Sequence, residues 1–253
     1  MARLTVFYVT YRKDLIWIVH STQLLHKHFR AAFDTVICAE EDCRDVCSTW
    51  GLPRTTYIYT KPWPDGYAFA MYQKTMADQY TDSELIMLLD SDHILLEPAH
   101  LEDFLDHGKP VIRYRDWDED PNDTSLTVGK EQWLPSTERV LGVPLDRDYM
   151  VGPPFIFWRD TFQKVRERVE DVTGLPFHDA VYSDRHYDYK NFLSHPKVYC
   201  DFEALGLYAA KFQPGRYTLS HHPRGTVWPF RVYWSHGDWT PTLAAKLAAL
   251  LAA

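Results

Sequence analysis

The chain has 253 residues, of which 45% are hydrophobic and 25% charged, as in an ordinary globular protein with one large α/β domain or two small ones. Its formal net charge of -8 disfavours general binding to a phosphate backbone or to an anionic membrane surface. The sequence has no run of about eighteen apolar residues and no signal-peptide pattern after Met1, so we expect a cytoplasmic protein without a membrane span and with reduced cysteines.

The first half of the sequence alternates between strand-like and helix-like segments. Short apolar runs bounded by turn residues predict the strands, and apolar residues at helical spacing predict the helices. The predicted strands span residues 4–10, 35–39, 56–60 and 85–89, and the predicted helices span 14–29, 43–50 and 68–80. This β-α-β-α order is typical of a parallel sheet with helices on both faces.

The second half is less regular and richer in loops, where binding groups usually lie. Strands are predicted at 94–96, 111–114, 155–158, 217–220 and 231–235, helices at 100–106, 161–172, 201–212 and 242–253, and an acidic loop at 116–123. No internal repeat or long linker divides the chain. We therefore predict a single domain over residues 1–253.

One motif stands out in this pattern. The apolar run Leu85–Leu89 stops abruptly at Asp90-Ser91-Asp92. A short, fully apolar run predicts a strand buried on both faces, and ligands of parallel sheets gather beyond the carboxyl ends of the strands. Alternation along an extended chain would send both carboxylates to one side, where their oxygens suit a hard divalent cation. Asp-Ser-Asp is also common in plain turns, so the position after a buried strand is what favours a metal site.

A family resemblance supports this interpretation. The stretch from Gly66 to Pro98 carries Gln73-Lys74 on a predicted helix, followed by Leu-Leu-Asp-Ser-Asp-His-Ile-Leu-Leu-Glu-Pro. It resembles the GT-A class of nucleotide-sugar glycosyltransferases, in particular bacterial and viral members with a strand-Asp-Ser-Asp segment. The resemblance implies a Rossmann-like α/β fold with a mixed, mostly parallel sheet flanked by helices. It assigns nucleotide-sugar binding to residues 1–115 and acceptor binding to residues 116–253.

In that class the two acids bind Mn²⁺ or Mg²⁺, which bridges the diphosphate of the donor. The resemblance implies that Asp92 is the direct metal ligand and that Asp90 contacts either the ribose or water bound to the metal. Many such enzymes add a histidine from near the C-terminus, and His236 fits that part. His221 and His222 are the alternatives. Neutral imidazole is an acceptable manganese ligand, although carboxylates dominate such sites.

The donor is expected to lie along the ends of the predicted strands. By the same resemblance, Tyr11 would stack on the base, Arg12 would approach the diphosphate, and an acid such as Glu40 would contact base or ribose. Lys74 would neutralise charge on the leaving group. The residues predicted to contact the nucleotide sugar are Thr10, Tyr11, Arg12, Glu40, Lys74, Asp90 and Ser91.

A carboxylate is expected to take the proton of the acceptor hydroxyl, as an inverting transferase requires. Glu203 is the first candidate, because the start of a predicted helix would keep its carboxylate ionised. Asp179 is the alternative. A purely structural role as a helix cap is also open for Asp201 or Glu203.

These expectations converge on metal-dependent transfer of a sugar from a nucleoside-diphosphate donor, typically a UDP-sugar, to a hydroxyl of a glycan, a small molecule or a modified DNA base. The alternatives are a nucleotidyltransferase or sugar pyrophosphorylase and a non-catalytic carbohydrate-binding protein. The first usually has a glycine-rich loop after the first strand, and the segment from Thr10 to Leu15 has no glycine. Loss of the acidic pair would favour the second, and the pair is present.

Overall fold

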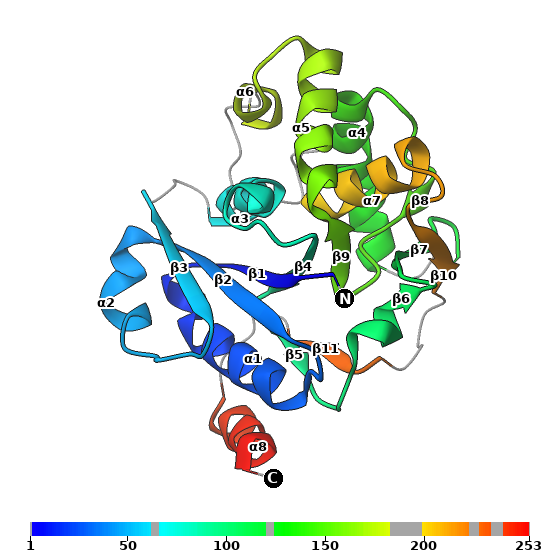
Figure 1. Cartoon of the computed structure of the whole chain (residues 1–253). Helices are drawn as coiled ribbons and strands as arrows, with labels where there is room; N and C mark the ends of the chain where they lie inside the picture. Colours follow the sequence, from blue (N-terminus) through cyan, green and yellow to red (C-terminus); the bar gives the residue numbers. More distant parts are fainter. Residues whose placement is uncertain are drawn as a thin grey trace.

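The central sheet of the protein has five strands in the order β3-β2-β1-β4-β9 (Figure 1). The computed structural model describes residues 2–61, 66–119, 124–182, 199–222, 228–233 and 240–252. The first four strands are parallel, and β9 is antiparallel to β4. The five strands are β1 (Leu4–Thr10), β2 (Phe33–Glu40), β3 (Thr55–Thr60), β4 (Leu85–Asp90) and β9 (Phe155–Trp158).

Helices cover both faces of this sheet, because its central strands are apolar on both sides. Every residue of β1 is buried. Phe7 and Val9 belong to one core with α3, α4, α5 and α7, whereas Val6 and Tyr8 belong to a second core with α1. The helices are α1 (Leu15–His28), α3 (Gly66–Thr75), α4 (Thr124–Leu141), α5 (Arg159–Thr173) and α7 (Asp201–Phe212).

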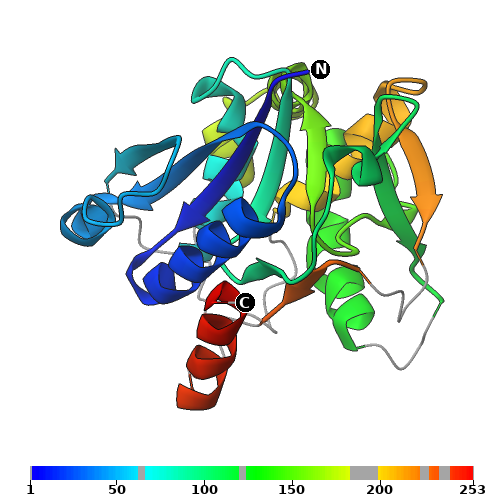
Figure 2. The ribbon, with the colours of Figure 1, turned by 60° about the horizontal axis from the view of Figure 1, so that its bottom comes forward.

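Two smaller groups of strands extend the fold. Strand β7 pairs with β10, β6 and β8, and β5 pairs with β11 in antiparallel fashion. Figure 2 shows β7 and β10 beyond β9, on the side away from β1. These strands are β5 (His93–Leu95), β6 (Leu105–Asp106), β7 (Lys109–Asp116), β8 (Arg147–Asp148), β10 (Thr218–His221) and β11 (Phe230–Val232).

Helix α8 (Pro241–Ala252) packs against α1 at the edge of the molecule. Leu247 is fully buried in a cluster with Trp17 and Leu24. The Lys27 ammonium donates to the carbonyls of Leu250 and Leu251, both at 2.8 Å. A cation at a helix C-terminus satisfies terminal carbonyls and complements the helix dipole. The last helix is therefore tied to the domain at both its apolar face and its end.

The predicted α/β class is confirmed, with a mostly parallel sheet flanked by helices in a single domain. One local prediction was wrong, and one helix was not predicted. The predicted helix at 100–106 is a single 3₁₀ turn, Leu101–Phe104, that leads into β6. Helix α4 was not predicted because it contains Pro135, and an internal proline is normally a helix-ending signal.

Two further observations concern the cysteines and the character of the helices. All four cysteines are free and buried. Among the residues that the structure describes, no helix has the length and apolar character needed to cross a membrane.

Candidate metal site and its surroundings

The candidate site lies where the connections of the sheet diverge. The chain moves outward from β1 through β2 to β3, and then returns across the sheet to β4 on the other side of β1. Such a switch point leaves a crevice beyond the carboxyl ends of the two inner strands, which is where open α/β sheets bind ligands. Asp90, the last residue of β4, is in register with Val9 near the end of β1. The motif therefore lies at the expected edge.

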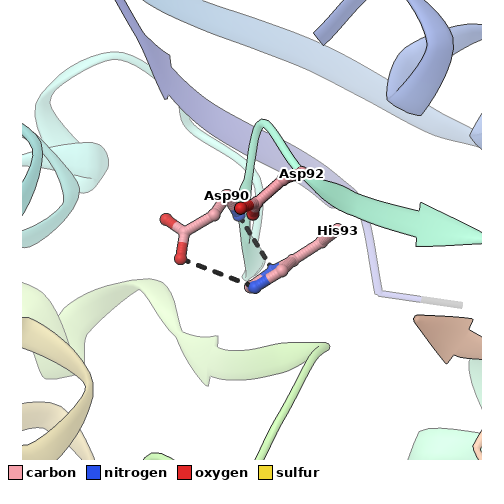
Figure 3. A group of neighbouring side chains, drawn as sticks. All are labelled: Asp90, Asp92 and His93. Atoms are coloured by element: carbon pink, nitrogen blue, oxygen red, sulfur yellow. Dashed lines mark hydrogen bonds and ion pairs between the residues drawn. The ribbon is translucent and has the colours of Figure 1, made fainter. Parts of the chain in front are cut away.

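A tight turn brings the polar groups together. Strand β4 ends at Asp90, Ser91 and Asp92 form the turn, and β5 begins at His93. One ligand atom from each of Asp90, Asp92 and His93 lies within 4.8 Å of the others (Figure 3). The acids converge because the chain turns, and not because it alternates along an extended strand as the sequence predicted.

Neighbouring elements hold this turn in place. The Ser91 hydroxyl donates to Asp14 Oδ2 at 3.0 Å, and the Tyr233 N–H donates to the Asp92 carbonyl at 3.0 Å. Asp14 precedes α1, and Tyr233 follows β11. The turn is thus fixed from the first helix on one side and from a late strand on the other.

His93 orients Asp90. Its Nδ1 accepts the backbone N–H of Asp90 at 3.0 Å, and its Nε2 lies 3.5 Å from Asp90 Oδ2. Burial lowers the pKa of His93 to about 4, with Asp90 opposing the shift, so the ring is neutral. A neutral imidazole whose Nδ1 accepts must carry its proton on Nε2. Neither nitrogen then offers a free lone pair, and we assign His93 a positioning role rather than that of a metal ligand.

Lys74 is the second group that holds Asp90. Its side chain is only 1% exposed, and Nζ lies 2.6 Å from Asp90 Oδ1 and 3.4 Å from Asp201 Oδ2. Burial alone would lower the pKa of Lys74, but Asp201 and Asp90 outweigh it and raise that pKa above its ordinary value. Lys74 was predicted from the sequence to contact the donor and neutralise charge on its leaving group. The structure instead buries it between two carboxylates.

The same ammonium controls the two acids. Burial tends to raise the pKa of Asp90, but the Lys74 charge overrides it and lowers that pKa below its ordinary value. In Asp201 the order is reversed, because burial raises the pKa to about 6 against the effect of Lys74. Asp201 is fully buried in the first turn of α7. Two carboxylates, from Asp90 and Asp201, therefore face one ammonium.

This donor set fits a divalent cation. Asp90 Oδ2 and the Asp92 carboxylate offer hard oxygen ligands at the edge of the sheet, as Mg²⁺ and Mn²⁺ prefer. Lys74 already occupies the side of Asp90 Oδ1. When Asp90, Asp92 and Asp201 are all ionised, the single positive charge of Lys74 leaves two negative charges uncompensated. A divalent cation would balance them. Asp92 and Asp90 are the residues that would hold it.

The residues predicted to bind the nucleotide separate into two groups. Thr10 is buried at the end of β1, and Tyr11 follows it. The Tyr11 ring lies next to Gly66, 3.7 Å from the position that a Cβ would take there. Together with Lys74, Asp90 and Ser91 they border the same edge of the sheet. Arg12 is exposed and is directed elsewhere, donating to the Asp42 carbonyl. Glu40 is the last residue of β2, the strand next to β1, and is half-buried.

Glu203 lies in surroundings that disfavour the ionised form expected from the sequence. Glu203 is fully buried, and its Oε2 accepts the Tyr149 N–H at 2.9 Å. Burial, together with the neighbouring Asp148, raises the pKa of Glu203 well above its ordinary value. Desolvation is thus a larger effect on this carboxylate than its place at the start of α7, and it disfavours the charged form.

The other predicted site residues lie apart from this cluster or outside the described residues. Asp179 is an exposed residue of α6 (Phe177–Tyr182), 3.1 Å from His178 Nδ1. His221 is on β10, where its Nε2 lies 2.9 Å from Glu119 Oε2, and His222 follows it. His236 lies outside the residues that the structure describes.

His93 and Asp201 are the site residues that sequence reasoning missed. His93 directly follows the motif, so its position next to Asp92 was the available signal. Asp201 was considered only as a helix cap, yet its helix has no side-chain cap. The sequence matches no protein-family model and no curated protein. The functional argument therefore rests on the geometry of the site.

Proposed function

We propose that the chain is a metal-dependent glycosyltransferase of the GT-A class, which moves a sugar from a nucleoside-diphosphate donor to a hydroxyl acceptor. One observation carries the proposal: the carboxylates of Asp90 and Asp92 converge at the carboxyl edge of β4, next to β1, at the switch point of the sheet. A metal there would offset the negative charge of the departing diphosphate, as a Lewis acid.

The remaining residues of the site act on Asp90 and on the local charge. His93 and Lys74 hold Asp90 from two sides and fix its orientation. Lys74 also keeps Asp90 ionised, so that the carboxylate is ready to bind a cation. Thr10 ends β1 and Tyr11 follows it, on the side where the nucleoside would lie. Holding the donor against the acceptor then supplies much of the rate enhancement.

Binding of Mn²⁺ and of nucleotide sugars tests the proposal. We expect Mn²⁺ to bind the wild-type protein in isothermal titration calorimetry, and one nucleoside-diphosphate sugar to raise the melting temperature only when Mn²⁺ is present. Asp92→Asn should weaken Mn²⁺ binding by about tenfold or more, because it removes a charged ligand. Asp34→Asn is the matched control, since Asp34 lies near the opposite end of the strands, on β2.

A wild-type protein that is stabilised by no nucleotide sugar, with or without Mn²⁺, would contradict the proposed function. Equal Mn²⁺ affinity in Asp92→Asn and wild type would contradict the assigned ligand. Hydrolysis or transfer products, analysed by NMR for the anomeric configuration, would then distinguish an inverting from a retaining reaction.

A further inference from the structure

Asp201, in the first turn of α7, is a buried acid without regular hydrogen bonds. Its side chain is fully buried, and neither carboxylate oxygen has a hydrogen-bond partner within the part of the chain that the structure describes. It does not cap its helix either. By contrast, the buried Asp78 accepts hydrogen bonds from Arg166 at 2.6 and 2.8 Å. A buried carboxylate without such bonds is costly, so Asp201 is poorly suited to a purely structural role.

The cation that faces Asp201 is the Lys74 ammonium, which two acids share. Nζ lies 3.4 Å from Asp201 Oδ2 and 2.6 Å from Asp90 Oδ1. It also lies 4.1 Å from the centre of the Phe202 ring. The Lys74 side chain is buried, so its charge cannot be screened by solvent. Lys74 is therefore a fixed positive charge next to a proposed metal ligand.

A fixed ammonium beside Asp90 works against the binding of a divalent cation. Like charges repel more strongly in a buried site than in water, because the effective dielectric constant is lower. Lys74 and Asp90 alone would form a neutral pair, and only Asp92 would offer the metal a full negative charge. Asp201 supplies a second counter-charge to Lys74. With it, the group of Asp90, Asp201 and Lys74 keeps one net negative charge.

We propose that Asp201 is a positioning residue of the metal site, which holds the Lys74 ammonium by its charge while Asp90 binds the cation. Asp201 itself contacts neither the metal nor the donor in this role. The inference rests on the metal site of the proposed function. It gives α7, from the second half of the chain, a part in a site whose ligands lie at the end of β4.

Titration of full-length variants with Mn²⁺ tests the inference. Calorimetry is carried out at about pH 7.5, above the Asp201 pKa of about 6, and at about 0.15 M salt. Asp201→Asn removes the charge and keeps the shape of the side chain. Its Mn²⁺ affinity should fall about tenfold or more, because one unit of charge is lost near a partly buried site. Asp201→Ser is neutral and smaller, should show the same loss, and replaces the asparagine variant if that variant does not fold.

Two comparisons separate the effect of charge from structural damage. Asp78→Asn also removes one negative charge and breaks a buried pair, but its cation is Arg166 and not Lys74. It should bind Mn²⁺ like the wild type. Lys74→Met combined with Asp201→Asn removes both charges of the shared pair. The double variant should recover most of the affinity that Asp201→Asn loses, which a purely structural role of Asp201 would not produce.

The wild-type protein provides a measurement that needs no variant. In ¹⁵N-labelled protein, Mg²⁺ should shift the Lys74 ammonium resonance, because Asp90 then divides its charge between Lys74 and the metal. The signal should remain that of a protonated ammonium, since Asp201 still pairs with it. A neutral amine in the Mg²⁺-bound protein, or no shift of the resonance, would contradict the inference.

The outcomes distinguish failure of this inference from failure of the proposed function. Equal Mn²⁺ affinity in Asp201→Asn and wild type would overturn the role of Asp201 and leave the metal site in place. An equally large loss in Asp78→Asn, or no recovery in the double variant, would overturn it in the same way. A wild-type protein that binds no Mn²⁺ would remove the metal site itself, and with it both the proposed function and this role.

Discussion

Two buried carboxylates in the first turn of α7, Asp201 and Glu203, have neighbours of opposite charge. Asp201 faces the Lys74 ammonium, which also holds Asp90. Glu203 is buried beside Asp148, which pairs with Arg115 at 2.6 Å, and burial together with Asp148 raises the pKa of Glu203. Both side chains are fully buried. The identity and burial of an acid do not fix its charge, because the neighbour that it meets decides whether a cation or a proton compensates it.

The clusters around Lys74 and Glu203 also differ in their access to solvent. The Lys74 cluster reaches the carboxyl edge of the sheet through Asp90, whose side chain is 36% exposed. The Glu203 cluster is enclosed and joins α7 to the segment 148–150 through the Tyr149 N–H. We therefore regard Glu203 as a group that fastens α7 to the segment 148–150, and three variants test this difference between the two clusters.

The largest effect is expected for Lys74→Met. The variant leaves Asp90 and Asp201 facing each other without their shared cation, and breaking a buried pair by removing one partner costs about 3–5 kcal/mol. Urea unfolding should show this loss in the free energy of unfolding. Lys211→Met is the control, because its pair with Asp146 is exposed and should contribute about 1 kcal/mol or less. Equal losses in the two variants would refute the central role of Lys74.

A smaller loss is expected for Gly206→Ala. A Cβ at this position would lie 2.5 Å from the Tyr149 Cβ, so α7 must move away from the segment that Glu203 binds. Overpacking of this kind costs about 1–3 kcal/mol, measurable by urea unfolding. Gly66→Ala is the control: its Cβ would lie 3.7 Å from the Tyr11 ring, an ordinary contact. A Gly206→Ala protein as stable as wild type would show that the close approach is not needed.

The effect of Glu203→Gln should appear only as a dependence on pH. The folded-state pKa of Glu203 lies above the unfolded value near 4.5. The folded protein therefore binds the extra proton in that window, and wild-type stability falls as pH rises from the unfolded pKa to the folded one. The slope is about 1.4 kcal/mol per pH unit. Glutamine is neutral at every pH and can still accept the Tyr149 N–H.

The difference in unfolding free energy between Glu203→Gln and wild type should thus grow in favour of the variant as pH increases above about 4.5. Unfolding curves at a series of pH values measure this difference. A constant difference would mean that Glu203 titrates normally in the folded protein, and it would reopen its role as an ionised base.

The sequence by itself determined the α/β class and the place of the acidic motif. Both follow from local signals: the apolar runs of β1 and β4 span the sheet, and Asp90 comes where such a run stops. It did not reveal α4, because Pro135 obscures the helical pattern. Only the tertiary structure decided how the motif is held. Lys74 and Asp201 come from distant parts of the chain, and their contact depends on how α3 and α7 pack.

The same reason explains the raised pKa of Glu203. A helix start favours an ionised carboxylate by a short-range effect that the sequence can show, but burial in the packed fold and the nearby Asp148, on another segment, act in the opposite direction. Likewise, no pattern in β7 distinguishes Arg113 from Arg115. Which arginine finds an acid is settled by Asp148 on β8. Charge compensation in a protein core is a property of the packed neighbours, and periodicity along the chain carries no information about them.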